Sequence, residues 1–204
     1  IFGSNPSIGA NVITPAPAFD GTVTVGASGD FSSLDTALDA LMSRGIESNT
    51  QVYLQSGFYQ LNQRLGFIPN TLTHTLTITG SPTAYIYGSA STASTNYALA
   101  LKNTRNLILD GLNIAPQQEA FSRAIAIERF CEDVSIQNCH ITMAANSLST
   151  DASAGIYSDN AMIRDLRVQN CQIENFSRGV LLSASSSFPN ESNLVELLDN
   201  EISG

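Results

Sequence analysis

Apolar residues recur at fixed positions in four eight-residue segments of the chain, which we call octads. The first and third positions of each octad are aliphatic, the second position varies, and the eighth is always Ile. The octads span residues 107–114, 134–141, 166–173 and 195–202. Positions one and three face one way and position two the other, which is the alternation of a β-strand. The octads therefore predict a strand that recurs in one repeating unit.

The fifth position of each octad predicts a corner in the backbone. Gly, Asn and Asp tolerate a left-handed backbone and form local hydrogen bonds, so they favour bends. The four residues are Gly111, Asn138, Asn170 and Asp199. After such a corner, the Ile at position eight begins another face of the fold. These Ile residues are 27, 32 and 29 positions apart, a period that suits one turn of a solenoid.

A second apolar strand precedes each octad, so each coil carries at least two strands. These strands are expected at residues 97–101, 124–127, 155–157 and 179–182. In a globular βα fold, parallel strands are joined by a crossover of about a dozen residues or more. No helix-length pattern separates these units, so the rest of each coil must supply the crossover. An antiparallel sandwich is the alternative, but it would not repeat Asn at one corner. We predict an all-β fold, a right-handed parallel β-helix solenoid, with one inward column formed by Ile114, Ile141, Ile173 and Ile202.

The first half of the chain predicts a short N-terminal capping α-helix at about residues 32–43. Its apolar residues Leu34, Ala37, Leu38 and Leu41 share one face. Ser32 with Asp35 resembles a capping box, and Gly45 is the expected stop. A helix at this point would cover the open end of the solenoid. Strands are expected before and after it, at residues 22–25, 51–54, 57–59, 76–78 and 85–87.

The domain organisation follows from these elements. Residues 1–21, with three prolines, are expected to form a linker or an extended lead-in, and residues 22–204 a single β-helix domain. Ile1 is interpreted as the start of a processed chain or an excised domain. Gly204 falls at a corner with no cap after it. We expect the natural protein to continue there, unless another subunit covers this end or a cap has been lost.

Composition excludes several classes of function. Only 13% of the residues are charged and the net charge is −9, which disfavours nucleic-acid binding. No apolar run has the roughly 18 residues that a membrane-spanning helix needs, so no membrane insertion is expected. The cysteines Cys131, Cys139 and Cys171 lack zinc-site spacing. They are interpreted as small buried residues, with a Cys139–Cys171 disulfide as the alternative.

Stacking of the octads brings candidate catalytic residues together. Glu132 is expected above Arg164, and Asp133 above Asp165. A catalytic interpretation makes His140 a general base, Arg164 an anion clamp, and the two aspartates a calcium pair or a dyad that shares a proton. The structural interpretation is a set of solvated residues with one Glu132–Arg164 ion pair. We favour the structural interpretation and therefore assign no catalytic residue.

Two further groups of side chains carry binding hypotheses. No cofactor is expected. Apart from the Asp133–Asp165 pair, calcium is considered at the capping region, where no calcium-loop spacing is present. The acidic residues there are Asp30, Asp35 and Asp39. Aromatic rings suit the faces of pyranose sugars, although ordinary packing is the favoured role for the tyrosines. The tyrosines considered are Tyr85, Tyr87 and Tyr97.

The segments TVTVGASGDFSSLDTALDAL (22–41) and VYLQSGFYQL (52–61) resemble the opening of pectinesterase-like β-helices. With TLTITG (75–80) and the coils that follow, the chain more closely resembles β-helix modules of very large surface proteins from Bacteroidetes-type bacteria. The likeness covers about residues 20–204. It implies export, through a type IX route, and roles in adhesion, gliding or cell-surface structure.

Motifs of the enzyme relatives are absent from the sequence. The pectinesterase motifs QDT and DFIFG, the polygalacturonase motifs NTD, DD and GHG, and the pectate-lyase element vWiDH do not occur. Divergent polysaccharide lyases remain possible relatives and would need a Lys/Arg pair, but Lys102 is the only lysine. We therefore expect a non-catalytic structural or adhesive module of a secreted, extracellular cell-surface protein. Its expected partners are neighbouring domains or subunits and extracellular polysaccharide, and the alternative is a lyase, esterase or hydrolase acting on such a polysaccharide.

Overall fold

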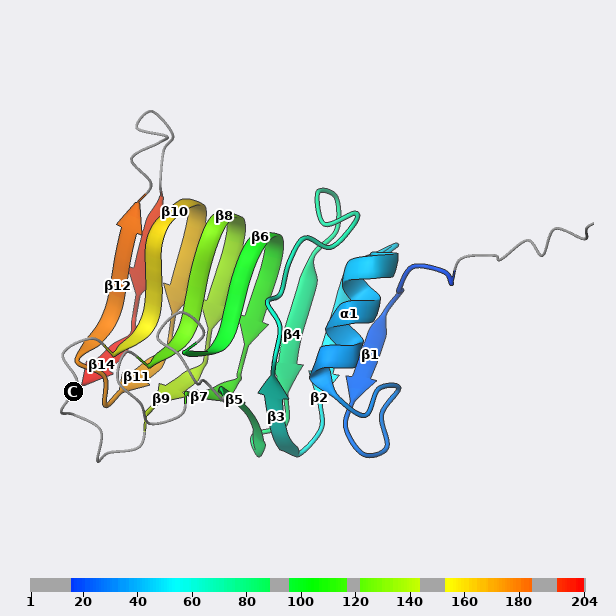
Figure 1. Ribbon diagram of the computed structural model, residues 1–204, viewed down its shortest axis with the longest axis horizontal. Helices are drawn as coiled ribbons and strands as arrows, with labels where there is room; N and C mark the ends of the chain where they lie inside the picture. The colour runs from blue at the N-terminus through cyan, green and yellow to red at the C-terminus, as the bar shows by residue number, and fades with distance from the viewer. Residues whose placement is uncertain (1–15, 89–95, 117–121, 144–152, 185–193, 204) are drawn as a thin grey trace, which may run out of the picture.

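The chain winds into a right-handed parallel β-helix whose coils stack along one axis (Figure 1). The computed structural model describes residues 16–88, 96–116, 122–143, 153–184 and 194–203. Within these ranges the strands form two sheets, and all the strand pairings are parallel. The predicted solenoid is confirmed. Most of the predicted lead-in lies outside the described residues, and its Phe19 forms a β-bridge with Ile46.

The larger sheet has eight strands, three of which are unusually long. In spatial order it contains β1 (Thr22–Val25), β2 (Thr50–Leu54), β4 (Leu76–Gly80), β6 (Tyr97–Asp110), β8 (Arg123–Gln137), β10 (Ala154–Gln169) and β12 (Arg178–Ala184), and β13 (Val195–Leu198) also pairs with β10. In β6, β8 and β10, the two strands that we expected before each corner are joined into one. Each long strand contains two residues with positive φ: Asn103 and Asn106 in β6, Arg129 and Asp133 in β8, and Asn160 and Asp165 in β10. The second residue of each pair, where φ is 47°, 53° and 55°, marks what we call the bend.

The smaller sheet has six strands and contains the predicted Ile column. Its strands are β3 (Gly57–Leu61), β5 (Ala84–Gly88), β7 (Asn113–Ala115), β9 (His140–Thr142), β11 (Gln172–Glu174) and β14 (Glu201–Ser203). Ile114 pairs with Ile141, Ile141 with Ile173, and Ile173 with Ile202. The first three are fully buried, whereas Ile202 is 49% exposed because it lies in the last coil described. The inward column is confirmed.

The corners between the two sheets also follow the sequence pattern. Gly111, Asn138, Asn170 and Asp199 have φ values of 63°, 54°, 51° and 52°. All four lie in the left-handed region, where their residue types are least strained. Each chain segment therefore leaves the larger sheet and enters the smaller one at an equivalent point, and this keeps the octads in register from coil to coil.

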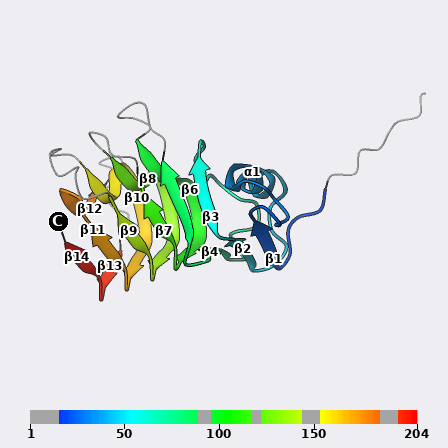
Figure 2. The same cartoon turned by 90° about the horizontal axis from the view of Figure 1, so that it is seen from below.

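Helix α1 (Leu34–Arg44) lies at the N-terminal end of the solenoid, beside β1 and β2 (Figures 1 and 2). Its four predicted apolar residues are buried, and Gly45 ends it with a φ of 76°. The predicted N-cap was wrong by one residue. Ser33, not Ser32, has extended backbone and accepts a hydrogen bond from the Thr36 N–H. In the described part of the chain, no helix has the length and apolar character needed to cross a membrane.

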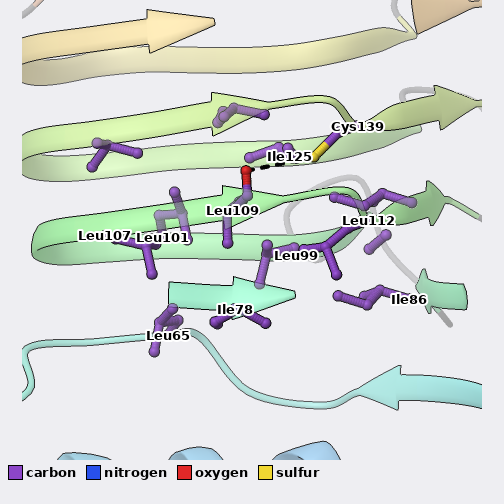
Figure 3. Close-up of a cluster of buried hydrophobic side chains, with 14 of the residues drawn as sticks. Leu65, Ile78, Ile86, Leu99, Leu101, Leu107, Leu109, Leu112, Ile125 and Cys139 are labelled. Carbon is purple, nitrogen blue, oxygen red and sulfur yellow. Dashed lines mark hydrogen bonds between the residues drawn. The ribbon is translucent and has the colours of Figure 1, made fainter. Parts of the chain in front are cut away.

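The core lies inside the coils and is formed by side chains from both sheets (Figure 3). All three cysteines are buried and carry free thiols, as the favoured interpretation predicts. The Cys139 thiol lies 3.7 Å from the Leu109 carbonyl. Burial raises the pKa of Cys131 to about 11. A hydrogen bond from Cys139 lowers the pKa of Cys171 and, together with burial, raises that of Cys139.

Candidate functional site

Two arginines and a glutamate form a network on the outer surface of the larger sheet, beside the bend. Glu132 Oε1 accepts a hydrogen bond from Arg164 Nη1 at 2.8 Å, and its Oε2 lies 3.2 Å from Arg105 Nε. The strand register places the three residues in consecutive coils. Both guanidinium groups also lie over the Phe130 ring, at 4.7 Å and 5.7 Å from its centroid. The predicted Glu132–Arg164 pair is confirmed as part of a larger network.

Sequence reasoning missed Arg105 and Phe130, although the repeat contained a signal for the first. Arg105 stands two positions before the first octad, as Glu132 and Arg164 stand two positions before the second and third. Extending the alignment backward by two residues would have revealed an Arg–Glu–Arg column. Phe130 pairs with Met162 in the next coil, so this position of the repeat carries no aromatic signal there.

A groove of about 280 Å³ lies along the same bend. Its lining residues come from three successive coils and are Asp133, Val134, Ser135, Asp165, Leu166, Arg167, Leu194 and Glu196. Burial raises the pKa of Asp133, and the charges of Asp165 and Glu132 raise it further, while Arg164 and Arg105 lower it. The predicted Asp133–Asp165 stack therefore exists, and its first member holds a proton more readily than an ordinary aspartate.

His140 lies on a different face from the other candidate catalytic residues. It begins β9 in the smaller sheet and stacks with Gln172 and, beyond it, Glu201, as the octads predict. Its Nε2 is 3.4 Å from Glu174 Oε2. The corner at Asn138 separates it from the bend. The structure thus brings Arg164, Asp133 and Asp165 to one surface and places the proposed base on another.

The carboxylates near the N-terminal end are engaged by hydrogen bonds. Asp30 accepts from the Thr24 N–H and hydroxyl, both at 2.8 Å, and these bonds lower its pKa. Asp35 accepts from the Asn62 N–H at 3.1 Å and from its side-chain amide at 2.8 Å. Among the described residues, no group of three His, Cys, Asp or Glu side chains could hold a metal ion. Calcium at this end stays a prediction.

Two of the three tyrosines considered for sugar stacking share an exposed surface. Tyr85 and Tyr87 point outward from β5 and meet Phe58 of β3, and these three form what we call the aromatic platform. Tyr97 does not join them. It lies in the larger sheet, is only 6% exposed, and packs with Ala100 and Ala126. Sequence reasoning missed Phe58, whose signal was the alignment of GFYQL with AYIYG one coil later.

Comparisons with known proteins reveal distant structural neighbours. No protein-family model and no curated protein matches the chain. A pectin methylesterase from Aspergillus niger is 16% identical, with 92% of this chain and 87% of that chain covered and a TM-score of 0.34. A carrot pectin methylesterase is 12% identical (93% and 84% covered, TM-score 0.38), and the PL6 family alginate lyase AlyGC 13% (94% and 30%, TM-score 0.45). At these identities and scores, the likeness assigns no activity and no site residue to this chain.

Proposed function

We propose that the chain is a non-catalytic structural and adhesive module of a large secreted cell-surface protein. The network of Arg105, Glu132 and Arg164 carries this proposal. In this network, Arg164, a candidate catalytic residue, and Arg105 both pair with Glu132 of the coil between them. Both arginines also pack on the Phe130 ring. These side chains join three consecutive coils, so their contacts favour a role in holding the solenoid together.

Other contacts support a stiff rod. Arg64 pairs with Glu128 at 2.7 Å, and Arg167 with Glu196 at 2.7 Å in the next coil. Exposed ion pairs each contribute only about 0–1 kcal/mol, so most of the stability comes from the buried columns. A rod of stacked coils keeps its surfaces at fixed positions. Such a rod suits a spacer that presents binding surfaces to neighbouring domains, subunits or extracellular polysaccharide.

One observation favours the alternative, a carbohydrate-active enzyme. The groove along the bend contains Asp133 and Asp165 in adjacent coils, and the first of these has a raised pKa. Two neighbouring carboxyl groups, one of which has a raised pKa, are an acid–base arrangement used in glycoside chemistry. In this alternative, Arg167 and Ser135 of the groove would contact the substrate.

An assay for turnover distinguishes the non-catalytic module from the carbohydrate-active enzyme. The protein is incubated with a panel of neutral and acidic polysaccharides, and both reducing ends and unsaturated products are measured. We expect neither product above a reaction without protein. Turnover that disappears in Asp165→Asn or Arg164→Gln would overturn the proposal in favour of the enzyme. His140→Ala tests the remaining candidate, and His74→Ala, which replaces the only other histidine, is its matched control.

A further inference from the structure

The outer face of the smaller sheet presents two columns of side chains that run along the solenoid axis. From the N-terminal end, the first column is Phe58, Tyr85, Asn113, His140, Gln172 and Glu201. The second column contains Gln60, Tyr87, Ala115, Thr142, Glu174 and Ser203. Strands in a sheet are about 4.8 Å apart, so each column is a regular array of side chains at that spacing.

The aromatic platform occupies the N-terminal end of this face. The Phe58 and Tyr85 rings stack with their centroids 5.5 Å apart and their planes inclined by 21°, and Tyr87 meets Phe58 edge-on at 6.4 Å. Phe58 is nevertheless 78% exposed, which makes it the most exposed large apolar side chain described. Three adjoining aromatic rings at the surface form an apolar patch of the kind that marks binding sites.

Amide groups lie beside the rings and are held in place. The Tyr87 hydroxyl donates to Gln60 Oε1 at 3.1 Å. The Asn113 amide, next to Tyr85 in its column, donates to the carbonyls of Pro82 and Ala84 at 3.0 Å and 3.1 Å. These bonds use the amide hydrogens of Asn113 and the hydroxyl hydrogen of Tyr87, so the Asn113 and Tyr87 side chains present oxygen acceptors to ligand hydroxyl groups at the edge of the stacked rings. Because these side chains are already positioned, little ordering is needed when a ligand binds.

The chemistry of the surface selects the ligand. Outward positions of β3, β5 and β7 hold no charged side chain, and the only aliphatic one is Ala115. Ionisable side chains on this face begin with His140 and Glu174, further along the axis. The apolar face and hydroxyl rim of a pyranose match the stacked rings and the polar oxygens at their edge. The net charge of −9 also disfavours a polyanion.

We propose that the aromatic platform is a binding site for a neutral polysaccharide, whose pyranose faces stack on Phe58 and Tyr85 while its hydroxyl groups donate to the oxygens of Asn113 and Tyr87. The inference rests on the proposed adhesive function and names its ligand class. Because the platform is part of a flat sheet, an extended chain fits it better than a small enclosed ligand. Such a chain would cross successive coils along the columns.

Affinity electrophoresis in gels that contain a soluble β-glucan, mannan or xylan tests the site, with polygalacturonate and alginate as acidic counterparts. The double variant Phe58→Ala/Tyr85→Ala is compared with Tyr53→Ala, which removes an aromatic side chain 37% exposed on the other sheet. We expect at least one neutral polysaccharide to retard the unaltered protein. The double variant should bind it at least about tenfold more weakly, and Tyr53→Ala should bind it unchanged. Thermal unfolding of each variant confirms that it is folded.

Three other outcomes of the binding experiment overturn the platform. If the double variant is retarded as strongly as the unaltered protein, the binding site lies on another surface, although the adhesive function would stand. Retardation by acidic polysaccharides only, or by none, removes the neutral ligand. Loss of co-sedimentation with phosphatidylcholine vesicles in the double variant, without any polysaccharide effect, assigns the surface to lipid instead. Turnover in the polysaccharide assay would contradict the non-catalytic proposal, yet it leaves the platform intact, so the two failures are distinguishable.

Discussion

Replacing Ile141 by Ala tests whether the inward column holds the coils together. Ile141 is fully buried and pairs with Ile114 in one neighbouring coil and with Ile173 in the other. Truncation leaves a cavity between two coils whose backbones are held apart by strand pairing. Large-to-small substitutions in cores cost about 2–5 kcal/mol, and the cost is higher where the site cannot collapse. We therefore expect a loss of about 4 kcal/mol in the free energy of unfolding.

The chain supplies a matched control in the same column. Ile202 makes the same strand pairing to Ile173, but it is 49% exposed. Full burial of an Ile side chain contributes roughly 1.5–3 kcal/mol, so a half-exposed one should contribute about 1 kcal/mol. Ile202→Ala leaves no enclosed cavity because one side of the residue is open. The two variants remove the same side chain from one column and differ in how deeply that side chain is buried.

Urea unfolding followed by circular dichroism measures the difference. For an m-value of about 3 kcal/mol/M, the two losses correspond to midpoints lowered by about 1.3 M for Ile141→Ala and about 0.3 M for Ile202→Ala. A second probe, such as tyrosine fluorescence, is required because solenoids can lose terminal coils before the rest. Equal shifts for the two variants would refute the reasoning, since they would mean that the column does not transmit packing between coils.

Three further predictions concern the bend and the helix end. The pKa of Asp133 is raised in the folded protein. The folded state therefore loses stability as the pH rises from the pKa of this group in the unfolded chain to its pKa in the folded protein. In thermal unfolding, Asp133→Asn should stabilise the protein more at about pH 7 than at about pH 3. Glu132→Gln should cost about 1–2 kcal/mol in urea unfolding at low salt, and less in about 1 M NaCl, because it weakens two ion pairs. Gly45→Ala should lower the melting temperature more than Gly21→Ala: both have a φ of 76°, but only at Gly45 would the added Cβ meet Pro69, at 2.7 Å.

The apolar pattern predicted the fold because burial repeats more strictly than any other property of the coils. One side chain must enter the core at the same height in each turn, so Ile recurs at the eighth octad position. The bend inside β6, β8 and β10 was harder to predict. Its residues Asn106, Asp133 and Asp165 stand directly before the octads and have positive φ. Sequence reasoning considered the two aspartates for their charge, whereas their backbone conformation already accounts for Asn and Asp there.

The candidate site was only partly predictable. Aligning the octads shows which residues are neighbours along the axis, but it does not show which face of the solenoid each side chain occupies. The octads correctly placed Asp133 beside Asp165 and His140 beside Gln172. Each coil, however, turns a corner between the bend and its strand in the smaller sheet, so residues such as Asp133 and His140 point to different surfaces. A ligand that contacts several coils must therefore follow columns within one face. On the smaller sheet, the columns change from aromatic and amide to charged along the axis, and this gradient directs a neutral polysaccharide to the end that holds Phe58.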